Sequence, residues 1–223
     1  MMSYIAISRM HFPVTNLGPG RRVGIWFQGC SIRCPGCISV DTWPEGRGKT
    51  SVSEVLEAIS TWIPPADGFT ISGGEPFDQP RALADLLAGI RSHSRADILV
   101  FTGHSLEAVG QQLSSMNGLI DALIADPFDL TASQTLALRG SDNQRLLLLT
   151  PLGRERFAGY DRPADVRDRS VDVMFDESGE IWLAGIPARD DFRRLQRVLQ
   201  SAGARVSISE DRRAGTRSEA VSE

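Results

Sequence analysis

The sequence predicts an α/β fold of parallel strands, followed by a small C-terminal α+β extension. Three observations support this fold class. Short apolar runs alternate with amphipathic helical patterns as far as about residue 150. Strands that alternate with helices imply parallel βαβ units. Beyond residue 150 the alternation stops, and a hairpin pattern with one further helix takes its place.

The strands are predicted from runs of apolar residues that are continuous or alternate with polar ones. These runs cover residues 4–8, 23–29, 68–72, 97–101, 119–125 and 145–150.

The helices between these strands are predicted from apolar residues at helical spacing. The clearest begins at Val52, with apolar residues at i, i+3, i+4 and i+7, and Ser51 and Glu54 form a capping box before it. Residues 79–93 show the same spacing, and a shorter helix covers 105–115 with its first residue as N-cap. Ligands of such folds bind at the carboxyl ends of parallel strands.

The segment 126–144 is polar and irregular, so we expect a long loop there, and loops of that length are usually either functional or disordered. After it, residues 171–186 are typical of a hairpin, 189–203 of a helix and 205–209 of a short strand. From about Glu210 the sequence lacks apolar residues that could anchor it. We therefore predict a core over 1–150, an extension over 151–209 and a disordered tail over 210–223.

The composition indicates an ordinary globular protein of the cytoplasm. The 223 residues are 41% hydrophobic and 23% charged, with a formal net charge of −4. This charge gives no electrostatic reason to expect nucleic acid or an anionic membrane as a partner. The chain contains no run of 18 apolar residues and no secretory signal pattern. In the cytoplasm thiols stay reduced.

All three cysteines of the chain fall within "CSIRCPGC", directly after the predicted strand 23–29. An odd number packed this closely does not suit a disulfide framework, so metal binding is expected. A closed zinc site needs a fourth ligand, and none of the three histidines, His11, His93 and His104, lies at finger-like spacing. A 4Fe-4S cluster on three thiolates would leave one iron without a protein ligand. Zinc and the cluster both stay open from spacing alone.

A second segment, "ISGGEP" at 71–76, ends the predicted strand 68–72. Its glycines leave backbone groups accessible, and the glutamate adds an acceptor that suits an ammonium group. Together, the spacing C-x3-C-x2-C and this segment resemble the radical S-adenosylmethionine (SAM) superfamily, in which the vacant iron binds SAM.

Within that superfamily the chain resembles the activating proteins of anaerobic ribonucleotide reductases, with pyruvate formate-lyase activating enzymes as wider kin. The resemblance covers roughly residues 4–150. The segments that carry it are 16–37, 41–43, 71–77, 101–107, 119–129 and 138–145.

The resemblance implies a set of site residues. The cluster ligands would be Cys30, Cys34 and Cys37. Residues that would line SAM or meet its amino group are Gly36, Cys37, Ile38, Gly73, Gly74 and Glu75. Thr102 and Gly103 would lie on the ligand-facing rim. For Arg139 and Asn143, a cofactor contact and a loop-anchoring role are both open.

The resemblance also implies a fold and a reaction. The fold would be a partial βα barrel, open enough to admit a peptide loop. A flavodoxin or ferredoxin would supply one electron, and cleavage of SAM would give a 5′-deoxyadenosyl radical under anaerobic conditions. In the activases this radical takes a hydrogen atom from a glycine of a glycyl-radical enzyme.

Two departures from the family pattern keep other functions open. His104 stands where the family usually has an aromatic residue, and residues 171–209 exceed what short activases need. The alternatives are a radical SAM enzyme that acts on a small molecule or peptide, as 7-carboxy-7-deazaguanine synthases do, and a non-catalytic metal-binding module.

Overall fold

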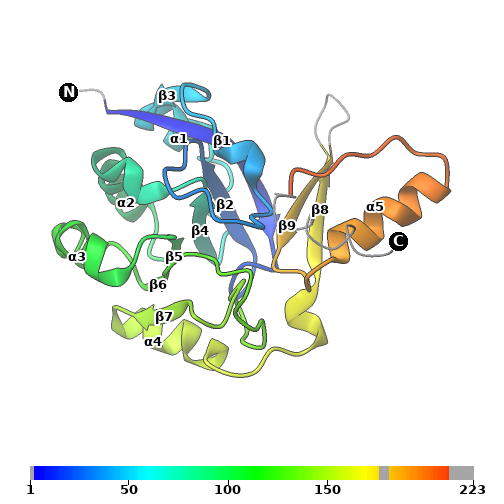
Figure 1. Ribbon diagram of the computed structural model, residues 1–223. Coiled ribbons are helices and arrows are strands. Elements are labelled where there is room, and N and C mark those ends of the chain that lie inside the picture. The colour runs from blue at the N-terminus through cyan, green and yellow to red at the C-terminus, as the bar shows by residue number, and fades with distance from the viewer. Residues whose placement is uncertain (1–2, 176–180, 211–223) are drawn as a thin grey trace.

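A seven-stranded sheet forms the centre of the computed structural model, which describes residues 3–175 and 181–210 (Figure 1). Its strands, in spatial order, are β3 (Lys49–Ser51), β1 (Tyr4–Val14), β2 (Arg22–Phe27), β4 (Gly68–Gly73), β5 (Asp97–Phe101), β6 (Ala122–Ala125) and β7 (Arg145–Leu148). The four strands β2, β4, β5 and β6 are parallel. The predicted α/β class with parallel strands is confirmed.

The two ends of the sheet differ from the prediction. Strands β1 and β7 lie where apolar runs indicated strands, but both pair antiparallel with their neighbours. A parallel pair needs a long crossover connection, usually through a helix. The connection 15–21 between β1 and β2 is too short for one, and the connection 126–144 between β6 and β7 contains no helix. In the described part of the chain, β3 and β7 are the two edge strands of the sheet. A partial barrel is therefore not confirmed and stays a prediction.

Three helices cover one face of the sheet: α1 (Val52–Ala58), α2 (Pro80–His93) and α3 (Leu106–Ser115). The capping box of Ser51 and Glu54 is present, and the Ser105 hydroxyl accepts from the N–H of Ala108 at the start of α3. All three helices predicted before residue 150 are therefore confirmed. No helix within the described residues is both long and apolar enough to cross a membrane.

The other face of the sheet is covered by later parts of the chain. Along β5, Ile98 and Val100 pack under the helices, whereas Leu99 points to the opposite face and meets Phe157. Phe157 belongs to α4 (Pro151–Phe157). The sequence did not reveal this helix, because seven residues are too few to show a repeated apolar spacing, and its N-cap, Thr150, falls in the run assigned to a strand. Short 3-10 helices cover Val40–Thr42 (η1), Pro76–Asp78 (η2), Ala158–Tyr160 (η3) and Val166–Arg169 (η4).

The C-terminal region contains an antiparallel hairpin, β8 (Val171–Phe175) with β9 (Ile181–Gly185), and the helix α5 (Asp191–Ser201). Both were predicted, although the tip of the hairpin, 176–180, lies outside the described residues. Met174 and Ala184 of the hairpin are buried against Trp26, so the hairpin packs on β2 from the face opposite to the three helices. The division of the chain at residue 150 stays a prediction.

The strand predicted at 205–209 is absent, since residues 204–210 have no regular structure. No strand of the described part of the chain pairs with this segment; instead, the side chains of Gln196 and Gln200 donate to the carbonyl of Val206. The predicted tail over 210–223 lies outside the described residues from 211 onwards. Its first residue, Glu210, is described and lies against the rest of the chain.

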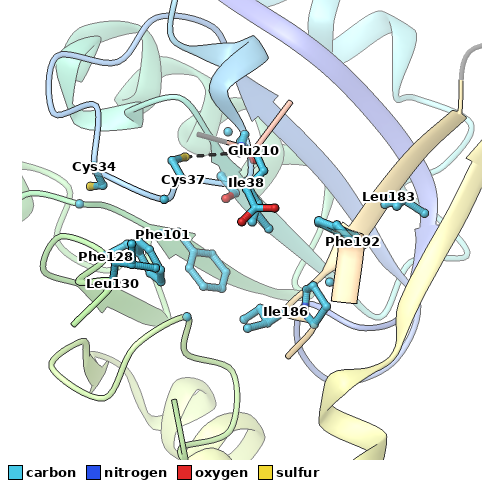
Figure 2. A pocket seen from close by; sticks show the side chains of 18 of the residues that line it. Cys34, Cys37, Ile38, Phe101, Phe128, Leu130, Leu183, Ile186, Phe192 and Glu210 are labelled. Atoms are coloured by element: carbon cyan, nitrogen blue, oxygen red, sulfur yellow. Dashed lines mark hydrogen bonds between the residues drawn. The ribbon is translucent and has the colours of Figure 1, made fainter. Parts of the chain in front are cut away.

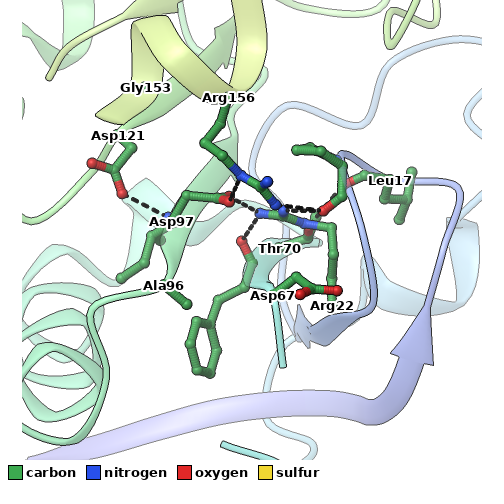
Figure 3. A network of polar contacts seen from close by, with 12 residues as sticks. Leu17, Arg22, Asp67, Thr70, Ala96, Asp97, Asp121, Gly153 and Arg156 are labelled. Carbon is green, nitrogen blue, oxygen red and sulfur yellow. Dashed lines mark hydrogen bonds and ion pairs between the residues drawn. The ribbon is translucent and has the colours of Figure 1, made fainter. Parts of the chain in front are cut away.

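A buried polar network joins the amino ends of the parallel strands (Figure 3). Arg22 starts β2 and Asp97 starts β5, and their fully buried side chains form an ion pair of 2.6 Å. Arg22 also donates to the hydroxyl of Thr70 and the carbonyl of Pro19, and Arg156 bonds the second oxygen of Asp97. Burial lowers the pKa of Arg22, and the charge of Asp97 opposes this shift.

Candidate functional site

A cavity of about 360 Å³ lies at the carboxyl ends of β2, β4 and β5 (Figure 2). Residues at the ends of these three strands border it. They belong to the cysteine loop after β2 (residues 28–43), to residues 72–75 at the end of β4 and to residues 101–103 at the end of β5. The position agrees with the rule that parallel sheets bind ligands at their carboxyl edge.

The cysteine loop is fixed at its start by backbone hydrogen bonds to the end of the same loop. The N–H of Gly29 donates to the carbonyl of Thr42 at 2.8 Å, and the N–H of Cys30 donates to that of Trp43 at 3.2 Å. Inside the loop, the N–H of Cys37 donates to the carbonyl of Cys34 at 3.1 Å. The loop therefore closes on itself and holds its three cysteines on one short stretch of chain.

All three thiols are free and border the cavity. Burial raises the pKa of each, that of Cys37 to about 11, although the N–H of Ser39 donates to its sulfur at 3.3 Å. Ligation of a cation would thus release protons from these thiols. Within the described ranges no three His, Cys, Asp or Glu side chains form a group suited to one metal ion.

Gly36 allows the cysteine loop to touch the loop 126–144. Its φ is +79°, and a Cβ there would lie 2.9 Å from a methyl group of Leu130 and 3.3 Å from the ring of Phe128. Ile38, at the rim, is 40% exposed. Both residues line the cavity, and their contact with SAM stays a prediction.

The segment Gly73-Gly74 brings the end of β4 against the cysteine loop. A Cβ on Gly74 would lie 2.8 Å from the carbonyl carbon of Gly29, and the N–H of Gly74 donates to the carbonyl of Phe27 at 2.8 Å. The two glycines also line the cavity. Gly74 therefore has to lack a side chain because the cysteine loop lies against it, whereas a Cβ on Gly73, whose φ is +106°, would meet the backbone of Trp26 and Phe27 in β2.

Glu75 is the most buried carboxylate on the cavity, with 1% exposure. Its Oε1 accepts from the N–H of Phe77 and the hydroxyl of Thr102, and its Oε2 accepts from the N–H of Gly103. Burial raises the pKa of Glu75, and these three donors oppose the shift. A carboxylate offers about four acceptor positions, so one remains on Oε2 for a ligand.

Thr102 and Gly103 therefore border the cavity as expected, and in addition they hold Glu75. The next residue, His104, contacts the Asp78 carboxylate at 3.0 Å. Asp78 in turn accepts from the N–H and the hydroxyl of Ser31 in the cysteine loop. Asp78 and Ser31 were not identified from the sequence, because only the fold brings these three segments together.

Arg139 and Asn143 are not among the residues that line the cavity. Arg139 is buried and pairs with Asp161 at 2.8 Å, while its Nε and Nη1 have no partner among the described residues. The side chain of Asn143 donates to the carbonyl of Pro127, which anchors the long loop. A contact of either residue with a cofactor stays a prediction.

The sequence also missed the cavity residues that follow β8. They are residues 183–190, Phe192, Arg193 and Glu210. No local pattern could have identified them, because their contacts with the core are set by the packing of the hairpin.

Comparison with known proteins adds independent findings. Residues 16–147 match a family described as "4Fe-4S single cluster domain". The anaerobic ribonucleoside-triphosphate reductase-activating protein of Salmonella typhi is 32% identical over 145 residues, which cover 60% of this chain and 93% of that protein. The pyruvate formate-lyase-activating enzyme of Clostridium pasteurianum is 41% identical over 75 residues, 31% of this chain and 32% of that protein.

One solved structure is also similar in part. The crystal structure of QueE from Escherichia coli matches with a TM-score of 0.37 and 20% identity, over 46% of this chain and 53% of that chain. Similarity at this level supports no statement about function.

Proposed function

This chain belongs to the radical SAM activating-enzyme family, and we propose that it is a glycyl-radical-enzyme activase. It would be an oxidoreductase that uses a 4Fe-4S cluster and SAM to remove a hydrogen atom from a backbone glycine of a partner enzyme. The observation that carries this proposal is the convergence of three thiols, the Gly73-Gly74-Glu75 segment and the end of β5 on one cavity.

The residues present fit such a cluster. Cys30, Cys34 and Cys37 stand on one loop and face one cavity, and three thiolates leave one iron open for the amino and carboxylate groups of SAM. When bound, the reduced cluster and SAM supply a 5′-deoxyadenosyl radical that takes a hydrogen atom from the substrate.

The side chains around the cluster loop would orient SAM and exclude water. Glu75, with its remaining acceptor position, suits the ammonium group of SAM. Apolar side chains, among them Phe101, Leu130, Ile186 and Phe192, line much of the remaining cavity. Such a lining keeps water away from a reactive radical.

The partners belong to the same proposal. The electron donor would be a flavodoxin or a ferredoxin, and the substrate protein a glycyl-radical enzyme such as an anaerobic ribonucleotide reductase. A cytoplasmic location would keep the thiols reduced. We expect neither nucleic acid nor a membrane as a partner, because the net charge is −4.

A second candidate is a radical SAM enzyme that acts on a small molecule or a peptide. The observation in its favour is that residues 183–190, Phe192 and Arg193, which follow the matched range 16–147, border the cavity. A wall on this side leaves less room for a loop of a large protein.

The test begins with anaerobic reconstitution with iron and sulfide. We expect about four iron and four sulfide per chain. Dithionite and SAM should then release 5′-deoxyadenosine, and Cys34→Ala should abolish both cluster and product. One zinc per chain without sulfide would refute the proposal. A glycyl doublet in electron paramagnetic resonance, seen with an anaerobic ribonucleotide reductase, would separate the activase from the second candidate.

A further inference from the structure

One side of the cavity is formed by residues that come after the matched range 16–147. We call this side the C-terminal wall and define it as residues 183–193 together with Glu210. Figure 2 shows labelled members of the wall, Leu183, Ile186, Phe192 and Glu210, around the same space as Cys34 and Cys37. The wall therefore borders the space where the cofactor would bind.

The C-terminal wall is tied to the long loop that forms another side of the cavity. The guanidinium group of Arg189 donates to the main-chain carbonyls of Leu130, at 2.7 Å, and of Ala132. The side chain of Gln134 donates to the carbonyl of Pro187 at 2.9 Å. These bonds fix the position of the wall relative to the cysteine loop, because Leu130 also touches Gly36.

The segment before Glu210 is attached directly to the cysteine loop. The hydroxyl of Ser209 donates to the carbonyl of Ile38 at 3.0 Å. The Oε1 atom of Glu210 lies 3.4 Å from Nη2 of Arg193, and both residues line the cavity. Glu210 is thus held beside the residue that follows the last cysteine.

One oxygen of Glu210 lacks a hydrogen-bond donor. Its Oε2 is buried and has no partner among the described residues, and the side chain as a whole is 13% exposed. A buried acceptor oxygen that receives no hydrogen bond lowers the stability of the folded protein, and most buried polar atoms in proteins have a hydrogen-bond partner. Arg193 contacts Oε1, and no described residue supplies a donor for Oε2.

We propose that Glu210 is a ligand-binding residue of this cavity, whose Oε2 accepts a hydrogen bond from an N–H group of the bound molecule. Arg193 holds the carboxylate in place. This rests on the proposed function, which supplies two molecules with N–H groups: SAM, through its amino groups, and the substrate glycine, through its peptide N–H. The extension that follows the family match would thus take part in recognition.

The test uses three variants in the full chain with its reconstituted cluster. Glu210→Met removes both acceptor oxygens at similar length, Glu210→Gln keeps one, and Glu155→Gln changes an exposed glutamate of α4 as the matched control. The dissociation constant of SAM is measured by anaerobic equilibrium binding. The second measurement is KM for a peptide that spans the radical-bearing glycine of an anaerobic ribonucleotide reductase.

Loss of a hydrogen bond to a charged group should weaken binding about ten- to hundredfold in Glu210→Met. A smaller loss is expected in Glu210→Gln and none in Glu155→Gln. Weaker SAM binding would assign the N–H donor to SAM. Unchanged SAM binding with a raised KM and an unchanged kcat would assign it to the substrate.

Unchanged values of both constants in the two Glu210 variants would overturn the proposal. Circular dichroism and urea midpoints establish that each variant is folded, and Glu210→Gln keeps the test valid if the methionine variant does not fold. Failure of the proposed function itself would be recognised separately, because the wild-type protein would then release no 5′-deoxyadenosine.

Discussion

The contact between β4 and the cysteine loop leads to a quantitative prediction for Gly74→Ala. The new Cβ would lie 2.8 Å from the carbonyl carbon of Gly29 and 3.0 Å from the carbonyl oxygen of Thr42, whereas real Cβ atoms essentially never come within 3.0 Å of another atom. Both neighbours are backbone atoms, so no side chain can rotate away. The end of β4 must therefore move away from the cysteine loop.

That movement puts two hydrogen bonds at risk, each of 2.8 Å: Gly74 N–H to the carbonyl of Phe27, and Glu75 N–H to that of Gly29. At about 0.5–1.5 kcal/mol each, their loss costs about 1–3 kcal/mol. Steric strain adds about 1–3 kcal/mol. We expect the free energy of unfolding to fall by about 2–6 kcal/mol, out of the roughly 5–15 kcal/mol typical of a domain.

The assay is urea unfolding of the reduced, cluster-free protein, followed by circular dichroism, with iron content after reconstitution as a second measurement. Gly110→Ala is the matched control, because a Cβ at Gly110 in α3 meets nothing within 4 Å. Alanine in a helix should raise stability there by about 0.5–1 kcal/mol. If Gly74→Ala unfolds at the wild-type urea midpoint and binds iron normally, the close approach of β4 to the loop is refuted.

Three further predictions follow from other contacts. Asp97→Asn leaves the charge of buried Arg22 uncompensated and should lower the unfolding free energy by about 3–5 kcal/mol in urea titrations. Thr102→Val removes a donor to Glu75 and should cost about 1.5–3 kcal/mol in the same assay. Because the pKa of Glu75 is raised in the folded chain, its contribution to stability falls as the pH rises above the ordinary pKa of 4.5. Loss of the Thr102 donor, which opposes the raised pKa, should make that fall larger. Arg189→Met should speed proteolysis within the long loop before β7, with little change in global stability.

The controls for these variants are exposed charged residues on the helices α2 and α5. Asp85→Asn changes an exposed carboxylate on α2 and should leave the urea midpoint unchanged. Arg194→Met removes an exposed arginine of α5 that pairs only with Asp191 within the described contacts, so the long loop should be cleaved at the wild-type rate. If Asp97→Asn has the same free energy of unfolding as the wild type, the ion pair of Arg22 and Asp97 does not stabilise the fold.

The sequence predicted those parts of the fold that depend on local patterns. The capping box of Ser51 and Glu54 and the apolar spacing of α2 are local, and both elements are present. Strand direction is not local. The run at 145–150 is as apolar as a parallel strand, yet β7 pairs antiparallel with β6.

The same distinction holds at the site. The three cysteines and the glycine-rich end of β4 are visible as motifs, because each lies within a few residues. The role of Thr102 as a donor to Glu75 spans 27 residues, and the contact of Ser209 with Ile38 spans 171. Contacts at such separations follow from the packing of strands and loops, which spacing along the chain does not encode.

Two segments within residues 16–37 lie at opposite ends of β2: Gly18-Pro19-Gly20 before the strand and the cysteine motif after it. The Gly-Pro-Gly segment before β2 places the carbonyl of Pro19 where Arg22 and Arg156 donate to it, beside the buried ion pair. The cysteine motif lies after β2, at the other end of the same strand. A strand of six residues separates them by about 20 Å, further than the range over which substitutions usually interact. The effects of one substitution at each end on the free energy of unfolding should therefore add, because the two sites share no partner.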